Sequence, residues 1–94
     1  MAKPVTTNAL QPVGTFFATT SQNTRQAPFP TAAEVAKPGV LGGYPYRVYF
    51  AIKIDNILWV LLESMTAGKF EWARADMSTS TGEIKYGGYV GDVF

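Results

Sequence analysis

The chain lacks two residue types entirely, because its 94 residues include no cysteine and no histidine. It therefore has no thiol nucleophile, no imidazole base, and no thiolate or imidazole ligand for a transition metal. These absences exclude a protease triad, a zinc amidase, a thiol peptidase and any disulfide bond. We expect no metal and no other cofactor.

An excess of one charge is also missing, since eight Lys and Arg residues oppose seven Asp and Glu residues, for a net charge of +1. The basic residues are scattered from Lys3 to Lys85 rather than clustered, which disfavours a nucleic-acid partner. No window approaches ~18 consecutive apolar residues, and no long amphipathic helix is indicated, so no membrane partner is expected. The carboxylates show no spacing diagnostic of a glycosidase pair. Together these features predict a chain without enzymatic activity.

A chain of this length predicts a single domain. Residues 1–12, which include Pro4 and Pro12, show no periodicity and predict a linker or N-terminal arm; residues 13–94 form the expected domain. From Gly14 onward, β-branched and aromatic residues dominate, with Gly and Pro at short intervals. We therefore predict an all-β fold, a small barrel of five to seven short antiparallel strands. Strands are expected over residues 15–19, 23–25, 46–54, 57–63, 70–75 and 84–90, with a polar turn at 78–82.

One short helical turn is expected over residues 31–37, because Thr31 and Glu34 have the spacing of a capping box and Pro38-Gly39 would end it. The clearest element is a hairpin with Asp55-Asn56 at its tip, since both residues tolerate the positive φ angles of a two-residue turn. This register places one wholly apolar face opposite a mixed one. The apolar face pairs Ile54 with Ile57, Ile52 with Trp59 and Phe50 with Leu61; the mixed face carries Arg47, Tyr49, Ala51 and Lys53 against Leu58, Val60 and Leu62.

Aromatic residues are abundant, with two Trp, five Tyr and six Phe. Exposed aromatic side chains on a β scaffold make rigid surfaces that lose little entropy on binding. We expect Trp59 in the core and Trp72 exposed as a ligand platform. Tyr44 and Tyr46 fit either role, and Tyr86 and Tyr89 are expected to pack against the barrel.

Several segments resemble bacterial SH3-type domains. Asn23-Thr-Arg25 followed by Pro28 resembles the Asn-x-Arg-x-x-Pro stretch of that family. Gly14-Thr-Phe-Phe17 is similar to the Gly-Thr-aromatic opening found in phage endolysins and lysostaphin-like bacteriolysins. Gly68-Lys-Phe-Glu-Trp72 resembles the family's Gly-x-x-x-aromatic strand. The resemblance spans roughly residues 14–90, in order and with matching spacing.

The resemblance implies an SH3-like barrel that binds the stem peptide or cross-bridge of peptidoglycan and targets a lytic enzyme to the Gram-positive cell wall. It implies an extracellular location, release at lysis if the chain is phage-encoded, and an N-terminal catalytic domain as a further partner. The family's cross-bridge groove maps onto Gln11, Val13, Thr15, Phe17, Asn23, Phe50, Ile52 and Trp72, and Tyr46 and Tyr49 on the same long strand are added as candidates.

Three of these positions depart from the lysostaphin-like pattern, which has tyrosine where this chain has Val13, Phe17 and Trp72. The departure favours a cross-bridge or stem peptide other than pentaglycine. The alternative function is a structural or protein-interaction module of a phage particle on the same barrel, because SH3-like barrels host many unrelated functions. A nucleic-acid-binding barrel is the third reading, and it would require salt-dependent DNA or RNA binding.

Overall fold

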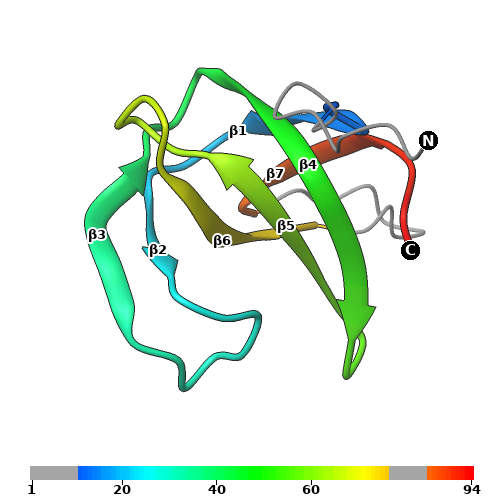
Figure 1. Cartoon of the computed structure of the whole chain (residues 1–94), viewed down its shortest axis with the longest axis horizontal. Coiled ribbons are helices and arrows are strands. Elements are labelled where there is room, and N and C mark those ends of the chain that lie inside the picture. The colour runs from blue at the N-terminus through cyan, green and yellow to red at the C-terminus, as the bar shows by residue number, and fades with distance from the viewer. Residues whose placement is uncertain (1–10, 77–84) are drawn as a thin grey trace, which may run out of the picture.

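The computed structural model describes residues 11–76 and 85–94 of the chain (Figure 1). In this part the protein is all-β, as predicted, and its strand number lies within the expected range. The strands are β1 (Gly14–Ala18), β2 (Gln22–Arg25), β3 (Glu34–Val40), β4 (Pro45–Ile54), β5 (Ile57–Glu63), β6 (Phe70–Ala75) and β7 (Gly87–Gly91). No helix in the described part of the chain has the length and apolar character needed to cross a membrane.

The strands form one antiparallel sheet in the order β3-β2-β6-β5-β4-β1-β7. The sheet is unclosed, so β3 and β7 are its two ends. An isolated parallel bridge between Asp76 and Gly88 brings β7 beside the end of β6. Figure 1 shows β4 as a long curved strand with β2 and β3 lying away from it across the molecule. β4 connects the two halves of the sheet, because β1 pairs with its first residues and β5 with the remainder.

The β4–β5 hairpin has the predicted register, with Ile54 opposite Ile57, Ile52 opposite Trp59 and Phe50 opposite Leu61. At its tip, Asp55 and Asn56 have φ angles of 50° and 67°. Two successive positive φ angles define the hairpin turn whose twist matches that of the flanking strands. The local turn chemistry therefore sets this register.

A register shift at Tyr49 decides which face of the hairpin is buried. Val48 pairs with Leu62, but Phe50 pairs with Leu61, so Tyr49 is an extra residue in β4. Such a bulge reverses the in-out alternation of the strand beyond it. Val48 and Ala51 consequently both point into the core, while Phe50 is 36% exposed. The side of the hairpin that faces the interior is therefore the mixed one.

The core lies on the opposite, mixed face of the hairpin and is completed by inward residues of the other strands. Its buried members are Phe16, Ala18, Val40, Val48, Ala51, Leu58, Val60, Leu62, Ala73 and Ala75. Lys53 shares this face but lies near the hairpin tip, where it is exposed. Trp59 is 1% exposed, as expected of a buried residue, but it lies on the other face and outside this cluster. Tyr89 packs against the core as predicted.

The expected helical turn at residues 31–37 is wrong, because Glu34–Val40 forms strand β3. Glu34 does not cap a helix; its carboxylate accepts a hydrogen bond from Asn23 on β2, 3.0 Å away. Pro38 fits this position because β3 is an end strand with only one neighbour. The predicted turn at 78–82 and the first residue of the predicted strand 84–90 lie outside the described residues, as does most of the predicted 1–12 linker. Strand β7 covers residues 87–90 of that last prediction and continues to Gly91, whereas Lys85 and Tyr86 are not in a strand.

Gly39 allows β3 to approach β2 closely. A Cβ atom at this position would lie 2.1 Å from Thr24 Oγ1, and the Thr24 side chain is fully buried. We predict that Gly39→Ala lowers the free energy of unfolding by about 1–3 kcal/mol, because the added methyl overpacks this contact. Urea denaturation monitored by tryptophan fluorescence would measure the change.

The Thr24→Ala background supplies the control for this prediction. Removing Oγ1 and Cγ2 relieves two of the clashes, so Gly39→Ala should cost less there than in the wild-type background. Equal costs in both backgrounds would contradict the proposed contact.

Candidate functional site

The outer face of the sheet carries a row of side chains that crosses five strands. Phe50 on β4 pairs with Leu61 on β5, and Leu61 pairs with Trp72 on β6. Trp72 then pairs with Arg25 on β2, and Arg25 pairs with Glu34 on β3. Directly paired residues point to the same face. The row therefore joins an apolar, aromatic end to a charged end.

The aromatic end of this row is widened by ring contacts into a surface that we call the aromatic face. Phe50 contacts Trp72 edge-to-face with ring centroids 6.2 Å apart, and Tyr49 contacts Phe70 in the same way at 5.1 Å. Phe94 lies against Phe50 at 5.4 Å. The bulge explains why two consecutive residues, Tyr49 and Phe50, both reach rings on β6. The aromatic face consists of Tyr49, Phe50, Phe70, Trp72 and Phe94.

The aromatic face is accessible to solvent, since Phe70 is 42% exposed and Phe94 is 85% exposed. The amide N–H of Phe94 donates to the carbonyl of Ala51 at 2.7 Å, which fixes residue 94 beside β4. A cavity of about 200 Å³ lies here and is lined by Val13, Phe50, Ala51, Asp92, Val93 and Phe94. This cavity gives the otherwise shallow aromatic face one deeper, largely apolar recess.

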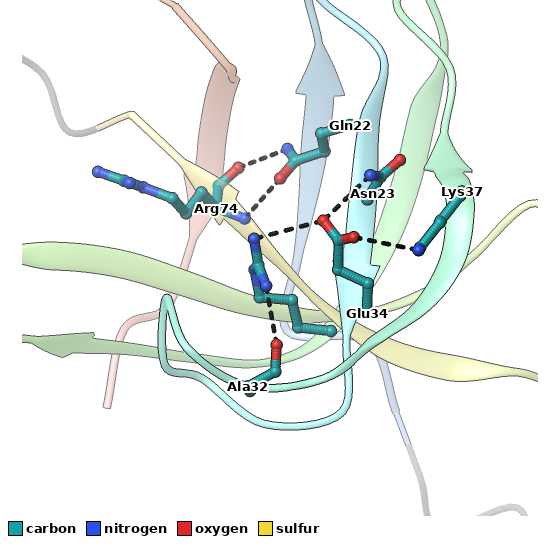
Figure 2. A network of polar contacts seen from close by, with 7 residues as sticks. Gln22, Asn23, Ala32, Glu34, Lys37 and Arg74 are labelled. Carbon is teal, nitrogen blue, oxygen red and sulfur yellow. Dashed lines mark hydrogen bonds and ion pairs between the residues drawn. The ribbon is translucent and has the colours of Figure 1, made fainter.

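The charged end of the row is organised around Glu34 (Figure 2). Its carboxylate accepts a hydrogen bond from Asn23 at 3.0 Å and forms ion pairs with Arg25 at 3.5 Å and Lys37 at 3.6 Å. Arg25 also donates to the carbonyl of Ala32 at 2.8 Å, which ties the β2–β3 connection to this group. We call Asn23, Arg25, Glu34 and Lys37 the Glu34 network. The hydrogen bond from Asn23 and the neighbouring Arg25 and Lys37 charges lower the pKa of Glu34 below its ordinary value, against the opposing effect of desolvation.

A second cavity, of about 170 Å³, adjoins the Glu34 network. Its lining residues are Gln22, Asn23, Arg25, Pro30, Glu34, Trp59, Arg74 and Tyr86. We call it the polar cavity. Trp59 belongs to its lining although it is only 1% exposed. Two hydrogen bonds hold the Gln22 side chain on β6. Its Oε1 accepts from the Arg74 N–H at 3.0 Å, and its Nε2 donates to the Arg74 carbonyl at 2.8 Å.

Tyr86 is held in this region by the carboxylate of Asp76. One Asp76 oxygen, Oδ2, accepts hydrogen bonds from the backbone N–H groups of Lys85, Tyr86 and Gly87. The ring of Tyr86 lies against two cations, with the Arg74 guanidinium carbon 4.9 Å and the Lys85 Nζ 5.4 Å from its centroid. Cations placed this way are attracted by the ring face.

No family model, curated protein or solved structure matches this chain. The assignment of a function therefore depends on the geometry of these surfaces. Within residues 11–76 and 85–94, no three His, Cys, Asp or Glu side chains gather closely enough to hold a metal ion.

Half of the predicted site residues meet on or beside the aromatic face. Tyr49, Phe50 and Trp72 belong to it, Val13 lines its recess, and Ile52 follows Phe50 on the same face of β4. Asn23 lies apart from them in the Glu34 network.

The remaining predicted residues are distributed elsewhere. Thr15 and Phe17 lie on β1, paired with Arg47 and Pro45, and Phe17 is 52% exposed. Tyr46 packs against the core, and its hydroxyl accepts a hydrogen bond from the Leu41 N–H at 2.9 Å. Gln11 is exposed ahead of β1.

Phe70, Phe94 and Arg74 are among the site residues that sequence reasoning missed. Phe70 could have been found, because it precedes Trp72 by two residues on a predicted strand and so shares its face. No local sequence pattern indicates that Phe94 belongs to the aromatic face, because its position beside Phe50 depends on the path of the chain after β7. Arg74 also lies two residues from Trp72 and so shares its face. Its contact with the Tyr86 ring could not be expected, because the hydrogen bonds to Asp76 hold Tyr86 in place.

The Glu34 network yields a test by titration. We predict that Asn23→Ala raises the pKa of Glu34 toward its ordinary value of 4.5, because the largest stabilising contact of the carboxylate is removed. Carboxyl ¹³C NMR would measure the pKa in the wild type, in this variant, and in Gln26→Ala as an exposed control.

The sign of the linked stability effect follows from the lowered pKa. The contribution of Glu34 to stability is complete above pH 4.5 and is lost as the pH falls through the lower pKa of the folded state. When the pH falls below 4.5, the free energy of unfolding should therefore decrease less in the Asn23→Ala variant than in the wild type. An unchanged Glu34 pKa in the variant would refute the assigned role of Asn23.

Proposed function

We propose that this chain is a non-catalytic binding module whose aromatic face holds an extended peptide of the bacterial cell wall, and that its sheet is a variant of the SH3-type barrel. The observation that carries the proposal is the cluster of rings on β4 and β6, in which Phe50 and Phe70 are exposed and Tyr49 and Trp72 are half-buried. Monomeric proteins rarely expose a contiguous apolar patch of this kind without a use for it. Rigid rings supported by paired strands suit the capture of a thin ligand.

The form of the aromatic face favours a peptide over a compact small molecule. Rings from three separate segments make a long, shallow surface, and its recess is only about 200 Å³ in volume. An extended peptide can lie across the rings and insert one small side chain into the recess beside Val13 and Phe94. The Glu34 network at the other end of the row supplies polar groups that can bind peptide N–H and C=O groups.

Binding at such a site should be weak. A thin peptide on a shallow surface buries little area, and the association entropy offsets much of the gain, so a dissociation constant on the order of micromolar or weaker is expected. A cell wall displays the same peptide at high density. Linkage to an enzyme or to a second module would then raise the effective concentration at the surface.

Retention on purified walls tests the proposal. The labelled chain should be retained on Gram-positive walls, with a preference among walls that differ in their cross-bridges. Retention on none of them would refute wall binding, and specific self-association under those conditions would instead support the alternative of a structural or protein-interaction module.

Trp72 is the ring of the aromatic face that pairs with Arg25 and so joins the rings to the charged end of the row, and it provides the site-directed prediction. We expect Trp72→Ala to weaken wall binding by roughly 2–4 kcal/mol, the loss typical of a central aromatic anchor. Tyr44→Ala is the matched control, because Tyr44 is 58% exposed but makes no ring contact with the aromatic face in the described structure. Equal retention of both folded variants would remove the aromatic face from the binding site.

A further inference from the structure

Arg74 lies on the outer face, paired with Trp59, and forms no ion pair within residues 11–76 and 85–94. Its Nε atom is buried and has no hydrogen-bond partner within the described residues. The two salt bridges found in this part of the chain involve Arg25 and Lys37, both with Glu34. Figure 2 shows the Arg74 side chain pointing away from Glu34. A buried donor of a charged group without an acceptor is unfavourable, and in native proteins it usually has a partner.

The surroundings of Arg74 are suited to hold such a partner. The guanidinium rests on the Tyr86 ring, and both residues line the polar cavity together with Trp59 and Arg25. The cavity thus has two arginines and two aromatic rings in its lining. Among its described lining residues, the one carboxylate is that of Glu34, which is already paired with Arg25 and Lys37.

We propose that the polar cavity binds a carboxylate carried by a small apolar group, such as the free C-terminal end of a peptide, and that Arg74 is its charged anchor. The terminal Nη donors of a guanidinium can bind the oxygens of a carboxylate. Trp59, Tyr86 and Pro30 provide apolar walls for an attached methyl-sized group. The nearby Glu34 disfavours a dianion such as phosphate relative to a monoanion.

The position of the cavity connects it to the aromatic face, and in this respect the inference rests on the proposed function. Trp72 and Arg74 are two residues apart on β6 and point to the same side, so they lie ~7 Å apart along the strand. A peptide lying over Trp72 would reach Arg74 within about two residues. The module would then distinguish peptides that end in a free carboxylate from peptides whose end is joined to a neighbour.

The test uses N-acetylalanine as the probe and N-acetylalaninamide as its neutral counterpart. In ¹⁵N-labelled wild-type protein, the acid should shift the Arg74 Nε–H signal and the Trp59 indole signal in a saturable manner, with a dissociation constant on the order of millimolar. The amide should shift neither signal at equal concentration. Equal shifts with the acid and with chloride or inorganic phosphate would overturn the carboxylate assignment, as would equal shifts with the amide.

Variants give a second measurement. Arg74→Gln should abolish the shift of the Trp59 signal by the acid, whereas Arg47→Gln, which removes the same charge from an exposed position on β4, should preserve it. Titration of the wild type keeps the proposal falsifiable if Arg74→Gln fails to fold. Wall retention without preference for the acid would overturn this inference alone, and preference for the acid without wall retention would overturn only the cell-wall assignment.

Discussion

The extra residue at Tyr49 is the constraint on which the rest of the structure depends. The turn at Asp55-Asn56 fixes which residues of β4 and β5 face one another, but it leaves open which face of the hairpin is buried. The bulge settles that choice. It turns Val48 and Ala51 inward and Phe50 outward, so the inward side of β4 carries branched and small side chains and the Phe50 ring remains partly exposed. Without it, the strand would present Phe50 and Ile52 to the interior beside Val48, and the outer face would lose its aromatic centre.

This arrangement separates stability from binding. The core occupies one face of the sheet, whereas the aromatic face, the Glu34 network and the polar cavity occupy the other. Trp59 is the exception, because it is fully buried yet belongs to the outer face. It pairs with Arg74 on β6 and lines the polar cavity together with residues of β2 and Tyr86. Changes to exposed rings should consequently alter binding with little effect on folding, while changes to Trp59 should affect both.

Sequence reasoning succeeded where the determinants are local. The hairpin register follows from the turn residues Asp55 and Asn56, and most strands follow from β-branched and aromatic runs. It failed where a distant partner decides the outcome. Thr31 and Glu34 have the spacing of a helix cap, but Glu34 instead finds Asn23 and Arg25 on β2. The bulge is likewise invisible in the alternation of apolar residues, since both faces of β4 contain them. The aromatic nature of the site was predicted from composition and Trp72; the contribution of Phe94 and Arg74 depends on tertiary structure alone.

The row of paired residues from Phe50 to Glu34 suggests how the two kinds of surface act together. Each neighbouring strand adds about 4.8 Å across the sheet, so five strands span roughly 19 Å, the length of five or six residues of extended chain. A ligand shorter than this can engage the rings or the charged groups but not both fully. On the proposed function, a ligand that engages both would gain contact area from the rings and polar contacts from the Glu34 network, with Arg74 two residues along β6 from Trp72. The proposal therefore assigns affinity and selectivity to different parts of the same face, and substitutions in one part should leave the contribution of the other in place.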